Sequence, residues 1–168
     1  MPDARTDVPR AGGERELLRA YLDFHRQTLA MKCAGLSDGD LRRRAAPPST
    51  LSLLGLVRHM AEVERAWFRR VIDGQDVPWL WSREGDHAAA FDVEGAAPAD
   101  AFAAWEAEIA HARRIEAAAP SLDVVGVDRR SGDEYSLRRV MVHVVQEYAR
   151  HNGHADLLRE RIDGATGV

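Results

Sequence analysis

The sequence of 168 residues has one cysteine, no excess of basic over acidic charge, and no long apolar runs. Its one cysteine, Cys33, cannot form a disulfide within the chain, which fits a reducing compartment, and we expect a cytoplasmic protein. The polar first residues lack the apolar segment of a signal peptide, and no apolar run is long enough for a membrane span. The formal net charge of −4 excludes a surface built for the phosphate backbone of nucleic acids.

Hydrophobic residues make up 45% of the chain and charged residues 30%, a balance typical of a globular domain with one core. We expect a flexible N-terminal arm over residues 1–13 and a single domain over residues 14–168. Apolar positions recur at helical spacing in four segments. These predict helices over residues 14–34, 49–74, 99–119 and 136–162, and therefore an all-α four-helix bundle.

Local signals set the expected helix ends. Ser49 or Thr50 is the expected N-cap of the second helix and Ser136 that of the fourth. Glycines at positions 35, 74 and 164 follow the ends of the first, second and fourth helices. The valines and turn residues of "VVGVDRRSGDEYS" indicate a short hairpin before the fourth helix.

A long connection over residues 75–98 separates the second helix from the third. Connections of this length are uncommon in compact domains unless they are functional or cross a bundle. Its Trp79, Trp81 and Arg83 either line the mouth of a site or pack across one end of the bundle. Cys33 lies near a helix end without an obvious base, so we interpret it as a packing residue rather than a nucleophile.

Two polar residues stand on the core face of the fourth helix. Glu147 and His151 are four residues apart, so they lie on one face of the helix and project into the bundle together. A buried carboxylate costs several kcal/mol unless an opposite charge compensates it, roughly the penalty for an unpaired ion. The opposite charge can come from a salt bridge or from a metal ion that both residues bind.

A third ligand has to come from another helix. His59 is the polar member of an inward seam on the second helix, which otherwise consists of Ser52, Leu56, Val63 and Ala66. Two histidines and one carboxylate form a set used by zinc and by non-haem iron, with positions left open for water or substrate. The alternative is that these histidines are hydrogen-bonded core residues without a metal.

The remaining histidines carry weaker signals. His154 is the most plausible substitute ligand, or a group that orients a metal-bound one. His143 and His154 fall toward the edge of the inner face of the fourth helix. His25 and His111 are expected at the surface, and His87 lies in the long connection, where it could border a cleft.

Two stretches, "STLSLLGLVRHMAEVERAWFRRVIDG" and "VHVVQEYARHNGHADLLRERIDG", together resemble the DinB-like (YfiT-like) superfamily of metal-dependent bundles. The resemblance covers residues 14–164 and is strongest to its mini-circle protein group. It implies an up-down-down-up four-helix bundle, with His59 and His151 at two ligand positions. Glu147 stands where the superfamily usually has histidine, as in the related mycothiol-dependent maleylpyruvate isomerase, whose zinc ligands are two histidines and one glutamate. His154 stands where glutamine is usual.

The resemblance also implies an activity. We therefore expect a divalent metal in this protein, namely zinc, with nickel or iron as alternatives, and several members of the superfamily use mycothiol or a similar thiol. The expected function is therefore a thiol-dependent transferase or isomerase acting on a small electrophile. The alternative is a non-catalytic metal-binding or stress-response bundle, and a third hypothesis is a bundle without metal. A homodimer is expected because dimers are frequent in the superfamily.

Overall fold

A computed structural model describes residues 5–83 and 86–167, and most of them are helical. The all-α class expected from the sequence is therefore confirmed. In the described part of the chain no helix is both long enough and apolar enough to cross a membrane. The elements in chain order are α1 (Glu14–Cys33), α2 (Asp38–Arg42), α3 (Leu53–Glu64), η1 (Arg65–Ile72), η2 (His87–Phe91), α4 (Pro98–Ala118), β1 (Val125–Val127), β2 (Glu134–Ser136) and α5 (Leu137–Asp163).

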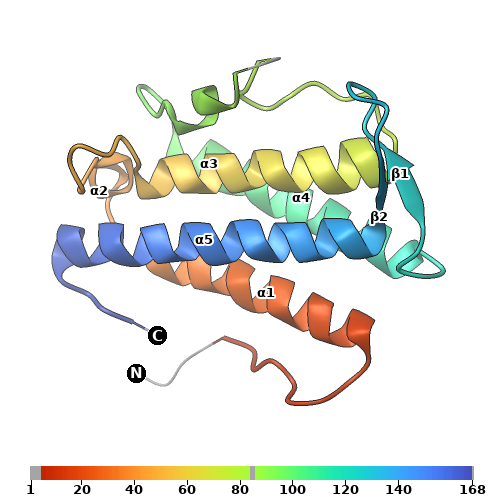
Figure 1. Ribbon diagram of the computed structural model, residues 1–168. Helices are drawn as coiled ribbons and strands as arrows, with labels where there is room; N and C mark the ends of the chain where they lie inside the picture. The colour runs from red at the N-terminus through yellow and green to blue at the C-terminus, as the bar shows by residue number, and fades with distance from the viewer. Residues whose placement is uncertain (1–4, 84–85, 168) are drawn as a thin grey trace.

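Four long helical segments lie side by side and enclose the core (Figure 1). The helix α1 packs against α5, while α3 packs against both α4 and α5. The interior between them is mostly apolar, and Cys33 belongs to its hydrophobic part with only 4% of its surface exposed. This burial agrees with the interpretation of Cys33 as a packing residue.

The helix ends follow the predicted signals with one exception. The Ser136 hydroxyl accepts a hydrogen bond from the Arg139 amide and caps α5, and Gly164 ends this helix with φ of 76°. The expected cap of α3 at Ser49 or Thr50 was wrong. Ser52 caps α3 by accepting from the Gly55 amide, because the buried face of the helix begins only at the leucine that follows it.

The helix α3 continues without a break into η1, a wider π-helical segment. Arg65 and Arg69 of η1 both bind the buried carboxylate of Glu108 on α4, at 2.9 and 3.0 Å. These ion pairs fix η1 against its neighbour. Segments of π-helix occur frequently at functional sites.

The predicted hairpin is present as the antiparallel pair β1 and β2, and it packs on η1 (Figure 1). Gly126 of β1 makes this close approach, since a Cβ atom at this position would lie 2.1 Å from the Val71 carbonyl oxygen. The absence of a side chain at Gly126 therefore sets how near the hairpin lies to η1.

The connection between η1 and α4 is long, as expected, and contains the 3-10 helix η2. Glu62 of α3 fastens it to the helical core. One carboxylate oxygen of Glu62 accepts hydrogen bonds from the amides of Trp81 and Ser82, at 2.7 and 2.8 Å. At the N-terminus the described residues 5–13 precede α1 without helix, and the Arg5 guanidinium lies 4.4 Å from the ring centre of Phe24.

Candidate metal centre and adjoining pocket

The structure brings together the three residues proposed as metal ligands. His59 comes from α3, while Glu147 and His151 come from successive turns of α5. Each offers one nitrogen or oxygen atom, and these three atoms lie within 4.8 Å of one another. A Glu147 oxygen is 3.7 Å from His59 Nε2 and 3.5 Å from His151 Nε2.

Packing around His59 and His151 holds their rings in place. The His59 ring stacks on Phe91 of η2 at a centroid distance of 4.8 Å. It meets the His151 ring edge to face at 4.6 Å. Glu147 keeps 19% of its side-chain surface exposed, so one side of the group stays open to a neighbouring pocket.

The His151 ring is held in its neutral form. Burial first, and then nearby His59, lower the pKa of His151 to about 4, while the Glu147 carboxylate opposes the shift. Only a neutral imidazole has a lone pair for a metal ion. At neutral pH, His151 is therefore ready to act as a ligand without first losing a proton.

His154 contacts His151 on the side away from Glu147. The two Nδ1 atoms are 3.3 Å apart, a distance at which one ring nitrogen donates to the other. A hydrogen bond from His151 Nδ1–H to His154 leaves the lone pair of His151 on Nε2, the atom that faces Glu147.

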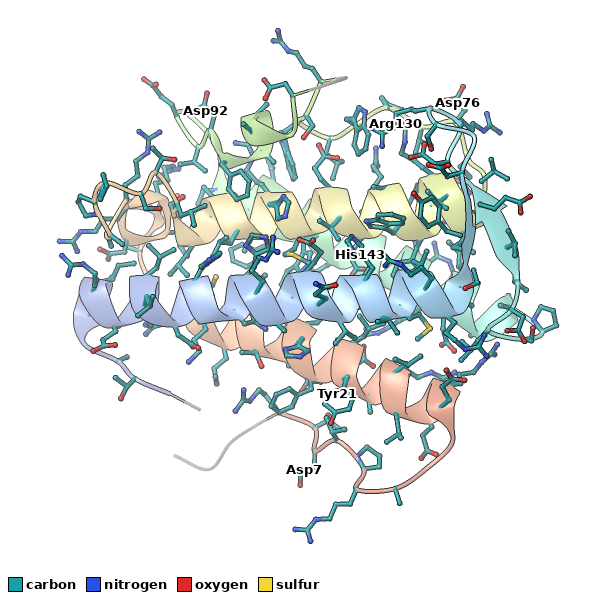
Figure 2. All side chains as sticks on the ribbon, viewed as in Figure 1. Asp7, Tyr21, Asp76, Asp92, Arg130 and His143 are labelled. Carbon is teal, nitrogen blue, oxygen red and sulfur yellow. The ribbon has the colours of Figure 1, made fainter. Side chains whose placement is uncertain are left out.

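His143 lies closer to the site than its predicted place at the edge of the helix face suggested. It precedes Glu147 by one turn, and its Nε2 lies 3.8 Å from a Glu147 oxygen. Figure 2 shows His143 in the space between α5 and α3. Its ring packs against Trp67 at 4.6 Å, and burial lowers the pKa of His143 below its ordinary value.

A pocket of about 410 Å³ adjoins the three-residue group. His59, Glu147 and His143 line one part of it, and η1, the long connection and the hairpin enclose the rest. The described residues in its wall are His59, Glu62, Val63, Ala66, Trp67, Arg70, Val71, Gln75, Asp76, Trp79, Ser82, Asp128, Arg129, Arg130, Tyr135, His143 and Glu147.

The three connection residues singled out from the sequence have different positions. Trp79 lies in the wall of the pocket, which corresponds to the alternative that it lines a site. Trp81 and Arg83 line a separate groove, where the Arg58 guanidinium lies 4.7 Å from the ring centre of Trp81. Sequence reasoning missed Glu62, a buried residue of the pocket wall that follows His59 by one turn on the inner face of α3.

The other histidines lie outside this group. His25 and His111 were expected at the surface, but both are half-buried. The Asn152 side-chain amide donates to the His25 carbonyl oxygen at 3.0 Å, and His111 pairs with Asp73 at 3.1 Å. Contacts between helices that are distant in sequence cover both rings. The side chain of His87 lies outside the part of the chain that can be described.

Comparison with known proteins supports a specific assignment. A sequence model of the mycothiol-S-transferase family matches residues 17–164, which is nearly the whole chain. The match includes every residue of the three-residue group and of the pocket wall. No curated protein sequence shows a significant match.

Proposed function

Because this chain belongs to the mycothiol-S-transferase family, we propose that it transfers the sulfur of mycothiol to a small electrophile, using a divalent metal held by His59, Glu147 and His151. The family is DinB-like, which confirms the resemblance seen in the sequence. We include in the proposal that α1, α3 with η1, α4 and α5 form the up-down-down-up bundle of that superfamily. In support, Figure 1 shows α1 and α5 running in one direction and α3 and α4 in the other.

The observation that carries the proposal is the convergence of three ligand atoms beside a pocket. Two imidazole nitrogens and one carboxylate oxygen fit zinc, and they also fit nickel or ferrous iron. Three protein ligands leave coordination positions open, which a catalytic site needs. The adjoining pocket of about 410 Å³ is the space from which a small molecule reaches those positions.

The chain's own residues prepare this site for transfer. A bound divalent ion supplies Lewis acidity, which lowers the pKa of a thiol and favours the thiolate nucleophile. His154 orients His151 through the contact between their Nδ1 atoms. The Trp67 ring, which packs against His143 beside Glu147, shields the reacting atoms from bulk water. Transfer forms one S–C bond, breaks the bond to a leaving group that departs with its electron pair, and releases the thiol proton.

Cobalt substitution tests the proposal directly. Adding mycothiol to the cobalt-loaded protein should produce a sulfur-to-cobalt charge-transfer band in the near-ultraviolet spectrum. The band should be absent in His59→Ala and retained in His111→Ala, which removes a histidine outside the group. If no thiol perturbs the cobalt spectrum at millimolar concentration, transfer is ruled out and a non-catalytic metal-binding bundle becomes the better account.

Two further expectations belong to the same proposal. A cytoplasmic location is supported by the single buried cysteine. A homodimer is supported by the frequency of closed two-fold dimers among homo-oligomers. A sedimentation mass near the 18.7 kDa of one chain at high micromolar concentration would contradict the dimer.

A further inference from the structure

The pocket has a second end, opposite the metal-ligand group, where charged residues gather. Arg70 of η1 meets residues of the connection and the hairpin there. Figure 2 shows Arg130 and Asp76 at this end of the molecule, above the end of η1. Three arginines and two aspartates of the pocket wall lie here, namely Arg70, Arg129, Arg130, Asp76 and Asp128. Positive charge is therefore in excess.

Two of these arginines are near aspartates, and the third has no carboxylate partner among the described residues. Arg130 pairs with Asp128 at 3.2 Å, and Arg129 lies 4.0 Å from Asp76. Arg70 has no carboxylate within 4.0 Å among the residues that the structure describes. Its guanidinium donates to the Val77 carbonyl and is stacked on a tryptophan ring of the connection at 4.5 Å.

Arg70 is half-buried and held in position by these contacts. A guanidinium keeps its charge in such an environment and offers a planar set of donors that matches a carboxylate. Asp128 is near enough for Arg70 to contribute to the lowering of its pKa, after the larger effect of Arg130. The two do not form an ion pair, so Arg70 remains available to a ligand.

The wall between the two ends is apolar and aromatic. Val63 and Ala66 lie on one side, and Trp67 meets Tyr135 of β2 edge to face at 5.1 Å. His59 and Arg70 are eleven positions apart on one continuous helix, which places their backbones roughly 15 Å apart along its axis. Because helical side chains lean toward the N-terminus, Arg70 reaches back into this interval. The remaining space suits one substituted aromatic ring.

We propose that the electrophile is a flat aromatic acid, whose carboxylate binds Arg70 while its reactive carbon lies near His59 and Glu147. The apolar wall accommodates the ring between these two ends. The part of this inference that concerns transfer rests on the proposed function. The part that concerns binding of an anion by Arg70 does not, and it can be measured without metal or thiol.

Binding is tested by titrating metal-free protein with 4-methylbenzoate or with its uncharged analogue 4-methylbenzamide. Quenching of tryptophan fluorescence reports the binding. Wild type should bind the acid at least fivefold more tightly, as roughly expected for one charge-assisted contact. Arg70→Met keeps an apolar stem against Trp79 but should abolish the preference. Arg70→Lys should retain part of it, and Arg44→Gln, an exposed arginine outside the pocket, should retain all of it.

Equal binding of acid and amide by wild type would overturn the proposal, and so would an unchanged preference in a folded Arg70→Met variant. Circular dichroism shows whether the variants fold. If Arg70→Met does not fold, the Arg70→Lys variant tests the proposal instead. A preference for the acid in Arg70→Lys as large as that of wild type would exclude recognition of the carboxylate by the planar guanidinium of Arg70.

Transfer is tested on metal-loaded protein with mycothiol and the matched pair 4-(chloromethyl)benzoate and 4-(chloromethyl)benzamide. Sulfur bonds to the benzylic carbon, the C–Cl bond breaks, and chloride leaves with the electron pair while the thiol proton goes to solvent. The ratio of kcat/KM for acid over amide should be at least fivefold in wild type and near one in Arg70→Met, in line with one charge-assisted contact. If neither compound reacts but the acid binds selectively, the anion site stands and the proposed function fails. If both react equally and bind equally, transfer stands and the anion site fails.

Discussion

The guanidinium of Arg26 on α1 donates to both carboxylate oxygens of Glu64 on α3, at 2.8 and 2.9 Å, in the interior of the protein. The two side chains are 5% and 0% exposed. The Tyr148 hydroxyl of α5 also donates to Glu64 and accepts from the Trp105 indole of α4, both at 2.8 Å. One polar network therefore joins all four long helices.

Removing one member of this network should destabilise the protein strongly. Glu64→Ala leaves the buried Arg26 charge with only the partly exposed carboxylate of Asp23 as a partner, at 3.0 Å, and we expect the free energy of unfolding to fall by about 3 kcal/mol. The double variant Arg26→Met, Glu64→Leu removes both charges and should recover most of that loss. Urea unfolding of metal-free protein measures both values, with Glu14→Ala at the surface as control. A loss below about 1 kcal/mol in Glu64→Ala would show that water reaches the pair.

Metal content is the second prediction. Untagged wild-type protein should contain about one divalent ion per chain, most often zinc, because three donor atoms converge at one point. His151→Ala and Glu147→Ala should each lower metal affinity by more than the roughly tenfold that loss of a hydrogen-bond partner of a ligand costs. His111→Ala should retain full metal content in elemental analysis, since it lies outside the group. Full metal content in His151→Ala would remove the basis for this assignment.

The stability of the metal-free protein should decrease as the pH is lowered from 6.5 toward 4. The pKa of His151 is about 4 in the folded protein, and burial is the largest cause of this low value. Burial also lowers the pKa of His25. In this pH range the unfolded chain binds protons that the folded chain does not, so acid favours unfolding. His151 alone contributes up to about 3 kcal/mol of this loss. Urea titrations at several pH values measure it, and His151→Gln should show a shallower pH dependence.

Cys33 should not react in the folded protein. It is buried, and burial raises the pKa of its thiol to about 12, so hardly any thiolate exists at pH 8. A disulfide reagent such as 5,5′-dithiobis(2-nitrobenzoate) should label it only after unfolding in guanidinium. Rapid labelling of the native protein would make Cys33 a rival for the nucleophilic sulfur, which we assign to an external thiol.

Gly126→Ala tests whether the hairpin must lie close to η1. The added Cβ atom would meet the Val71 carbonyl oxygen at 2.1 Å, so the hairpin has to move away, and the residues it contributes to the pocket move with it. We expect a loss of about 2 kcal/mol in stability, as is typical of overpacking, together with weaker binding of 4-methylbenzoate. Gly153→Ala is the matched control. Its Cβ atom meets nothing within 4 Å, and alanine in a helix should stabilise the protein by about 0.5 to 1 kcal/mol.

The sequence by itself determined the helical segments and the shared direction of Glu147 and His151. Both follow from the helical repeat, a local property that places residues four apart on one face. Ser136 and Gly164 could be predicted as helix ends for the same reason, because capping depends on neighbouring residues. Even here the start of α3 was misplaced, since several polar residues compete for the cap and burial of the following leucines decided between them.

Only the tertiary structure decided which distant residues meet. Arg26 and Glu64 are 38 positions apart and carry no periodic signal that marks them as partners. The contact of Trp67 with His143, and the place of Arg70 at the far end of the pocket, depend on how η1 packs against α5 and the hairpin. Close packing sets these contacts through the shapes of many side chains at once, and the spacing of residues along one helix does not contain that information.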